Sequence, residues 1–434
     1  MNVKNTAVRL KATLSLFDAV GIGIGAIIGA GIFVVIGIAA APAGTGLLVS
    51  IILAGVISLL TALSTTELSA HITKEGGIYT FATEMLSPFV GFLTGWIWVV
   101  SNIFVGAAVA LGFGHYFNSL LPSIDARLAA VLLVLALTVF NLMGSQRSSM
   151  LNNILVIIKL VVLVLFVVVG SMHFKIGNFV PFAPFQPGVI YGAYFIFFAY
   201  SGFARIAVIS EEIRNPAKNV PRAIFLSLAI SAVVYLIVGF VALGVSGASM
   251  LGQSNSPLAD AMKVTGNLTA SHIVSVGALI ATATVLLTTI LGVSRVTYSM
   301  AQKRDLPLFL GTLHSRFDTP FHAIWISGII MVLLAIFIDL TQVVSISVFA
   351  SLFYYTIANI SALRMKRTDR RFPTIVPILG AVTCIAMMVF SSFHAPWSLG
   401  AGAICLIIGA GYYVIKHRLG RLKIINGKTT HGGI

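Results

Sequence analysis

The segment that decides the fold reads Gly21-Ile-Gly-Ile-Gly25-Ala-Ile-Ile-Gly29-Ala30-Gly31-Ile-Phe33. It is apolar enough to lie in a bilayer, yet it is rich in glycine. Because glycine costs about 1 kcal/mol relative to alanine inside a helix, this segment is a place where a helix can open. Close helix packing is the alternative, since small residues let two backbones approach and Gly25 and Gly29 have the G-x-x-x-G spacing.

The rest of the sequence is typical of an integral membrane protein. Of its 434 residues, 58% are hydrophobic and 9% are charged, whereas a soluble domain carries about 25% charged residues. Lone strands would leave backbone groups unpaired in lipid, so the spans are predicted to be helices. We therefore expect an all-α membrane protein with about twelve transmembrane helices. The apolar runs are residues 15–40, 45–70, 88–118, 127–144, 151–171, 188–212, 219–244, 271–300, 321–338, 341–363, 374–392 and 397–416.

The net charge of +15 is distributed as in a membrane protein, and it does not indicate a nucleic-acid partner. With the N-terminus in the cytoplasm, the inner segments hold 21 basic residues, and the outer ones hold three, Arg127, Lys175 and Lys263. Lysine and arginine concentrate in cytoplasmic loops, and anionic lipid headgroups attract them weakly. We expect a multi-pass protein of the cell membrane with both termini in the cytoplasm. The basic start, with Lys4 and Arg9, is interpreted as leading into a retained first helix.

A second interruption lies in the sixth span, where the sequence reads Phe197-Phe198-Ala199-Tyr200-Ser201-Gly202-Phe203. The first and sixth spans occupy equivalent places if the chain contains two repeats of five helices. Interrupted helices at equivalent places in two repeats indicate a transport site. We expect one transmembrane domain over 1–434, with a first repeat at 15–171, an inverted second repeat at 188–363 and two extra helices at 374–416.

Such interruptions predict a site for a zwitterion. A helix that restarts leaves amides free at its beginning, and one that stops leaves carbonyls free at its end. The amide end attracts a carboxylate, and the carbonyl end attracts an ammonium group. Two interrupted helices side by side therefore favour an α-amino acid over a sugar, which would need many side-chain amides and acids.

The same residues resemble the amino acid–polyamine–organocation (APC) transporters. The resemblance rests on the motif Gly25 to Phe33, the sixth-span motif with its tail Ser210-Glu211-Glu212-Ile-Arg214-Asn215-Pro216, the segment Val220-Pro221-Arg222-Ala223-Ile224, and Glu67 followed by Gly76-Gly77-Ile-Tyr79. The resemblance covers nearly the whole chain. Within the family, the sequence is similar to the proton-coupled members with broad specificity. It implies the leucine-transporter-like fold of five plus five inverted helices, followed by two more.

The resemblance also implies which residues bind the substrate. The carboxylate is expected on the amides around Gly29, Ala30 and Gly31. The ammonium group is expected at the carbonyls of Ile27, Phe198, Ala199 and Ser201, with Phe198 closing the pocket as a gate. The sequence departs from members specialised for cationic substrates at Arg205, and it has no acid inside the predicted site. A neutral amino acid is therefore favoured over a cationic one.

Lys159 is the ionisable residue that most strongly suggests a function. It lies in the fifth span, about 10–12 Å inside its cytoplasmic end, and an ionisable residue at that depth is expensive. A snorkelling lysine is the alternative. In the proton-coupled members a lysine here replaces a bound sodium ion, which implies contacts with the Gly25 carbonyl and the Thr284 hydroxyl. Because burial disfavours the charged form, we expect Lys159 to gain and lose one proton per transport cycle.

Several alternatives stay open at the level of sequence. An exchanger of amino acids, a polyamine or amine transporter, and a membrane sensor that binds amino acids without moving them would share much of this pattern. A channel would need a polar stripe, and an intramembrane enzyme would need clustered acids or histidines, so we expect neither. No cofactor or metal site is expected, because Cys384 and Cys405 lack metal-ligand spacing. Asp18 is interpreted as part of a helix cap with Ser15.

Overall fold

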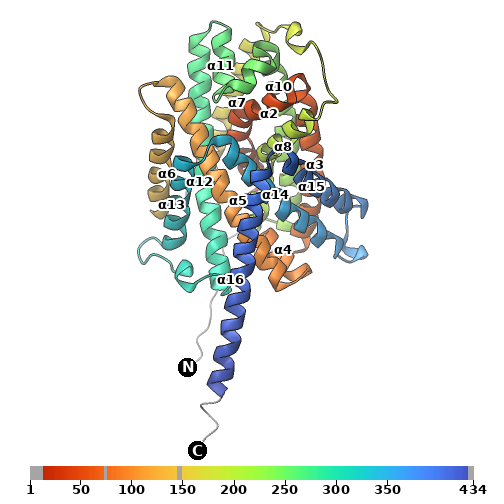
Figure 1. Cartoon of the computed structure of the whole chain (residues 1–434), viewed down its shortest axis with the longest axis vertical. Helices are drawn as coiled ribbons and strands as arrows, with labels where there is room; N and C mark the ends of the chain where they lie inside the picture. Colours follow the sequence, from red (N-terminus) through yellow and green to blue (C-terminus); the bar gives the residue numbers. More distant parts are fainter. Residues whose placement is uncertain (1–12, 73–75, 144–148, 429–434) are drawn as a thin grey trace, which may run out of the picture.

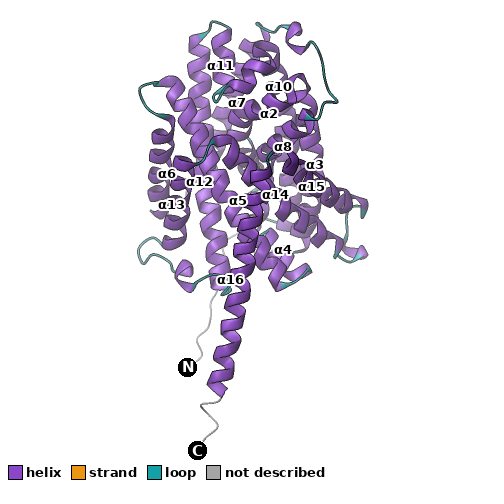
Figure 2. Cartoon of the chain, in the orientation of Figure 1, coloured by secondary structure: helices purple, strands orange, loops and turns teal. Residues whose placement is uncertain are grey.

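The computed structural model describes residues 13–72, 76–143 and 149–428. The regular secondary structure of this described part is helical, with loops between the helices and no strand (Figure 2). Its single β-bridge joins Leu14 to Ile213. The basic residues Lys4, Arg9 and Lys11 lie outside the described residues. The prediction of an all-α protein is therefore confirmed.

Most of the helices coincide with the predicted apolar runs. They are α1 (Leu16–Ile27), α2 (Ile36–Ala43), α3 (Leu47–His71), α5 (Pro88–Leu120), α6 (Ala126–Leu142), α7 (Ser149–Ser171), α8 (Gly188–Tyr200), α9 (Ala204–Val208), α10 (Pro216–Gln253), α12 (Leu268–Gln302), α13 (Phe321–Phe337), α14 (Leu340–Leu363), α15 (Ile375–His394) and α16 (Pro396–Lys428). Two further helices, α4 (Ile78–Met85) and α11 (Pro257–Val264), lie between the predicted apolar runs, in segments where no helix was predicted.

Nine helical segments of the described chain are long and apolar enough to cross a bilayer. One of them, Leu16–His71, has 56 residues, which exceeds the roughly 20 residues that one crossing needs. This segment turns at Gly44, where φ is 55°. Two shorter apolar helices, α6 and α13, accompany the nine. The protein is thus a multi-pass membrane protein, and the count of twelve crossings stays a prediction.

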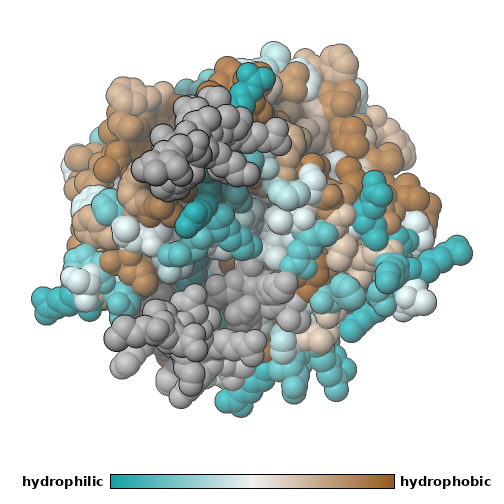
Figure 3. Space-filling view, turned by 90° about the horizontal axis from the view of Figure 1, so that it is seen from below, coloured by the Kyte–Doolittle hydropathy of each residue, from teal (hydrophilic) through white to brown (hydrophobic). Residues whose placement is uncertain are grey.

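The outer surface of the helices suits lipid. On α7, Ile157, Val161, Val164 and Val168 are 51–61% exposed and recur every three or four residues, which places them on one helix face. Viewed from below, hydrophilic side chains gather over the middle and lower part of one end of the molecule, with hydrophobic ones around its upper margin (Figure 3). An exposed apolar face of this kind marks contact with something other than water.

The contacts between the helices show which of them surround the centre of the bundle. The first span packs on α10, and α3 packs on α8. Helix α5 runs through the middle of the bundle against α12 and α14, and α7 packs on α12 (Figure 1). Helices α6 and α13 form an outer pair, and α16 extends beyond the rest of the bundle at the lower end of Figure 1. The centre of the bundle therefore lies between the first span, α5, α8, α12 and α14.

The first span is broken at the predicted place. Helix α1 ends at Ile27, and Ile28 is extended, with φ −77° and ψ 95°. The chain becomes helical again at Ala30 and passes through a π-helical turn, Gly31–Val35, into α2. Its carbonyl and amide ends therefore meet in the interior of the bundle.

The sixth span differs from the prediction, because it tightens where an open break was expected. Helix α8 is followed by a 3-10 turn, Ser201–Phe203, and then by the five residues of α9. The backbone from Tyr200 to Ala204 keeps right-handed helical angles throughout. The hydrogen bonds of a 3-10 turn join each carbonyl to the amide three residues later, and they satisfy amides that an unwound segment would leave free. The sixth span thus offers fewer free backbone groups than the first.

Candidate functional site

A small cavity lies where the first span is broken. The centre of a water molecule can occupy about 30 Å³ of it, enough for one or two waters. Its walls come from the first span, α5, the sixth span, α12 and α14. They are Ala26, Ile27, Ala30, Gly31, Trp98, Asn102, Val105, Val109, Phe198, Ala199, Ser201, Gly202, Ala204, Arg205, Val285 and Tyr354.

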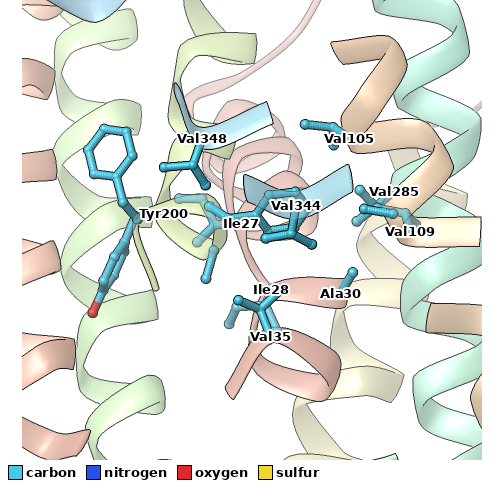
Figure 4. Packing of buried hydrophobic residues seen from close by; sticks show 14 of the residues in the cluster. Ile27, Ile28, Ala30, Val35, Val105, Val109, Tyr200, Val285, Val344 and Val348 are labelled. Carbon is cyan, nitrogen blue, oxygen red and sulfur yellow. The ribbon is translucent and has the colours of Figure 1, made fainter. Parts of the chain in front are cut away.

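One side of this cavity is a set of valines. Val105 and Val109 of α5 and Val285 of α12 face the broken segment around Ile27 and Ala30 (Figure 4). These side chains hold the broken segment in an apolar surrounding, so its unpaired peptide groups are not exposed to bulk water. In such surroundings an electrostatic attraction to a ligand is stronger than it is in water.

Six of the seven residues predicted to bind the substrate line the cavity: Ile27, Ala30, Gly31, Phe198, Ala199 and Ser201. Gly29 does not line it. A methyl group at Gly29 would overlap the side chain of Val285, so this glycine lets the first span pack closely on α12. The two interpretations of the glycines thus both apply, with an open backbone on one side and close packing on the other.

The first and sixth spans touch directly at two glycines. A methyl group at Gly31 would overlap Ala199, and one at Gly202 would overlap the Ala26 carbonyl. Because the second contact is with backbone, no side-chain rotation can relieve it. The two spans are therefore fixed to each other beside the cavity.

Tyrosine hydroxyls bind several of the carbonyls that were expected to meet an ammonium group. Tyr235 of α10 donates to Ile27 O over 2.7 Å and lies 3.1 Å from Ala199 O. Tyr355 of α14 donates to Ser201 O over 2.7 Å. Each carbonyl oxygen has a second lone pair, so these bonds leave room for another donor. These tyrosine contacts were not predicted from the sequence, although a buried tyrosine hydroxyl usually has a partner.

Lys159 occupies the end of the broken helix. Its side-chain nitrogen donates to Gly25 O over 3.0 Å and to Ile28 O over 2.8 Å. The side chain is fully buried, on the face of α7 opposite its exposed valines. Snorkelling to the interface is therefore excluded, and Lys159 provides hydrogen bonds to carbonyls that the break of α1 leaves unpaired.

Thr284 is placed differently from the expectation. Its hydroxyl donates within its own helix, 2.9 Å from both Ile280 O and Ala281 O. Within the described residues it makes no hydrogen bond with Lys159. The contact of Lys159 that the sequence did not include is the carbonyl of Ile28, which becomes available because the helix ends there.

Arg205, at which the sequence departs from members specialised for cationic substrates, lies in the cavity wall. Its guanidinium donates to the hydroxyl of Thr288 over 2.8 Å and to that of Thr289 over 2.5 Å. Asn102 also lines the cavity, and its amide donates to Trp98 O in its own helix. Both residues thus border the cavity.

Polar contacts join the ends of the first and sixth spans. Leu14 N donates to Glu212 O, and Arg214 N donates to Leu14 O, each over 2.9 Å. The Glu212 carboxylate pairs with Arg295 of α12 over 2.8 Å. The Ser15–Asp18 capping box is present at the start of α1, as predicted. These bonds hold the lower end of the first span against the segment that follows α9.

Glu67 has a related role with another loop. Its buried carboxylate accepts hydrogen bonds from the backbone amides of Arg371 and Phe372. It therefore fixes the loop between α14 and α15 through backbone groups.

Comparison with known proteins agrees with this arrangement. A family model described as amino acid permease matches residues 14–411. The chain belongs to the amino acid permease family, within the APC superfamily. The permease is therefore a membrane transporter, as the resemblance in the sequence implied.

Curated relatives cover almost the whole permease. An uncharacterised transporter of Mycobacterium tuberculosis is 37% identical over 95% of this chain and 93% of its own length. The methylthioribose transporter of Bacillus subtilis is 33% identical over 89% of this chain and 90% of its own length. The branched-chain amino acid permease BcaP of Bacillus subtilis is 28% identical over 94% of both chains. These names agree on transport and differ in the solute.

Proposed function

We propose that this permease is a secondary active transporter that moves neutral L-amino acids by alternating access and couples them to protons. The observation that carries the proposal is the cavity at the break of the first span. We also propose, from the distribution of basic residues, that it lies in the cell membrane with both termini in the cytoplasm.

The amide end of the break would bind the substrate carboxylate. The helix resumes at Ala30, and the first amides of a helix have no partner within it. These amides and the helix dipole together favour an anion. Ala30 and Gly31 both line the cavity, so a carboxylate there would lie against them. Gly29 would contribute through its backbone amide only.

The carbonyl end would bind the substrate ammonium group. Ile27 O and Ala199 O already share the hydroxyl of Tyr235, which shows that the two carbonyls converge. The ammonium would use their second lone pairs or displace the hydroxyl. Phe198 and Ser201 in the cavity wall would complete this side, with Phe198 as a gate.

Lys159 would couple the proton to the movement of the broken helix. When charged, its ammonium group is attracted to the carbonyl end of α1, where the helix dipole is negative. When it loses the proton, this attraction falls although the amine can still donate hydrogen bonds. The lower half of the first span would then be released from α7. One proton per cycle would follow, with Gly25 and Ile28 as the acceptors and Thr284 as a neighbour without a direct bond.

The packing of the helices supports two inverted repeats of five. In these repeats the first span corresponds to α8, and α3, α5, α6 and α7 correspond to α10, α12, α13 and α14. The contact of the first span with α10 then corresponds to the contact of α8 with α3, and the α5–α14 contact corresponds to the α12–α7 contact. The α5–α12 and α6–α13 contacts each join two corresponding helices. All of these contacts are present. The repeats would be residues 15–171 and 188–363, with 374–416 as the two additional helices.

Uptake into proteoliposomes tests the proposal. An inward proton gradient should drive accumulation of a neutral amino acid above equilibrium, and removing sodium should have no effect. Sodium dependence would contradict the role of Lys159. Uptake only into vesicles that already contain an amino acid would indicate an exchanger, and binding without flux would indicate a sensor. Polyamines are disfavoured because no acidic side chain lines the cavity within the described residues.

A second candidate is an uncharged sugar derivative, since one relative is named a methylthioribose transporter. The free amides and carbonyls around the break favour a zwitterion over such a solute. Competition separates the two candidates. Excess unlabelled alanine should abolish uptake of the transported solute if that solute is an amino acid. Excess methylthioribose should abolish the uptake if the solute is a sugar derivative.

A further inference from the structure

Arg205 differs from the other cavity residues in its charge. It is the one charged side chain in the cavity wall within the described residues. No acidic side chain pairs with it in residues 13–72, 76–143 and 149–428. A cation in the membrane interior without an acidic partner is costly and usually functional. Its role is not part of the binding chemistry described above, which uses backbone groups.

The two threonines hold the guanidinium in one orientation. Each threonine hydroxyl donates to a carbonyl of its own helix: Thr288 to Val285 O over 3.0 Å and Thr289 to Val285 O over 2.7 Å. A hydroxyl has a single hydrogen, so both oxygens can only accept from Arg205. The side chain therefore cannot move away from the cavity without losing two bonds.

The guanidinium has more donors than these bonds use. It carries five N–H groups, and two of them bind Thr288 and Thr289. In the part of the chain that the structure describes, the remaining donors have no protein acceptor. Arg205 keeps part of its surface accessible and borders the cavity. A ligand in the cavity can therefore supply an acceptor for these donors.

We propose that Arg205 is a specificity-determining residue that selects amino acids whose side chains end in an oxygen acceptor. Among the neutral substrates proposed above this favours a side-chain amide, and it extends the range of substrates to a side-chain carboxylate. The inference rests on the proposed function, because it assumes that the α-carboxylate and the ammonium group are held by the break. The side chain of the substrate then points to Arg205. Its oxygen accepts from the free guanidinium donors, and a side chain that ends in an ammonium group is repelled.

The nearly isosteric trio of asparagine, aspartate and leucine tests the selection. Purified protein in proteoliposomes takes up labelled alanine, whose side chain is too short to reach far beyond the break, in competition with each of the three and with lysine. Asparagine and aspartate should inhibit at concentrations about tenfold or more below that of leucine, because a hydrogen bond to a charged group is among the strong ones. Lysine should be the weakest competitor.

The variant Arg205→Gln should lose this discrimination, which is measured as the ratio of inhibition by asparagine to inhibition by leucine and normalised to the variant's own rate of alanine uptake. We expect the difference between asparagine and leucine to shrink to about threefold or less. Arg295→Gln is the matched control, because Arg295 is also in the bundle but pairs with Glu212 and is not in the cavity wall; its discrimination should equal that of the wild type. If Arg205→Gln does not fold, the upward shift in melting temperature of the wild type with asparagine but not with leucine provides the same test.

Each outcome decides the inference. Equal inhibition by asparagine and leucine in the wild type overturns it and leaves the proposed function intact, as does an unchanged ratio in Arg205→Gln. Uptake that requires chloride and does not depend on the side chain of the amino acid would show that the free Arg205 donors bind an inorganic anion. That result would overturn the inference as well. Failure of every amino acid, including alanine, to be taken up or to compete would refute the proposed function and this inference together.

Discussion

The side-chain nitrogen of Lys159 lies 2.8 Å from the carbonyl oxygen of Ile28, the residue at which α1 stops being helical. A side chain from the fifth span thus completes the hydrogen bonds of a break in the first. The same nitrogen donates to Gly25 O. The state of Lys159 and the position of the broken helix are therefore linked through two bonds.

Replacing Lys159 with methionine should abolish proton-driven accumulation. Methionine fills a similar volume without a donor or a charge, so Gly25 O and Ile28 O lose their partner. An unsatisfied buried group costs about 1–3 kcal/mol, which predicts a lower melting temperature. Uptake should be measured with and without an inward proton gradient. A variant that accumulated substrate as the wild type does would remove Lys159 from the coupling.

Replacing Tyr235 with phenylalanine should weaken the site more than it weakens the fold. The single hydroxyl hydrogen is shared between Ile27 O and Ala199 O, and its loss costs about 1 kcal/mol. We expect a rise of about fivefold in the KM for the amino acid. Tyr194→Phe is the control, because Tyr194 is equally buried and donates to Ser345 O away from the cavity. Similar KM values in the two variants would contradict this prediction.

Replacing Gly202 with alanine should destabilise the protein. The added methyl group meets the Ala26 carbonyl and its backbone, and overpacking costs about 1–3 kcal/mol. The melting temperature and the yield of folded protein in detergent are the measurements. Gly400→Ala in α16 is the control, since nothing lies within 4 Å of its added methyl group. It should be neutral or stabilising, because alanine is the better helix former.

The ion pair between Glu212 and Arg295 should contribute little on its own. Both side chains are about one quarter exposed, and partly exposed pairs contribute about 0.2–1 kcal/mol. Glu212→Lys should cost more, because it places two cations together. Adding Arg295→Glu should restore most of the loss. A double-mutant cycle on melting temperature measures this coupling, and no restoration in the swapped pair would show that the two charges do not interact.

The fold could be predicted well because hydropathy is a local property. The runs at 15–40 and 45–70 correspond to the first span and α3, and the glycines of residues 21–31 located the break of α1. The 3-10 turn at Ser201–Phe203 was not predicted, since its backbone is set by the close approach of Gly202 to Ala26. That approach depends on how two distant spans pack.

The site could be predicted only where it is made of backbone. Ile27, Ala30 and Gly31 were identified because a broken helix exposes peptide groups wherever it lies. Tyr235, whose hydroxyl joins two of the carbonyls beside the cavity, was missed. An apolar span does not indicate which of its faces is turned toward the centre of the bundle when its lipid face is apolar too.

The sequence by itself determined that the chain crosses a membrane and where its first span opens. It also placed Lys159 so deep in the fifth span that its burial suggests a function. The tertiary structure decided which side chains meet at that opening. It placed Arg205 against Thr288 and Thr289, and it gave Lys159 the carbonyl of Ile28 in addition to that of Gly25. The physical reason is that the cost of burial depends on residue type alone, whereas the compensating hydrogen bonds depend on the rotation of each helix about its own axis.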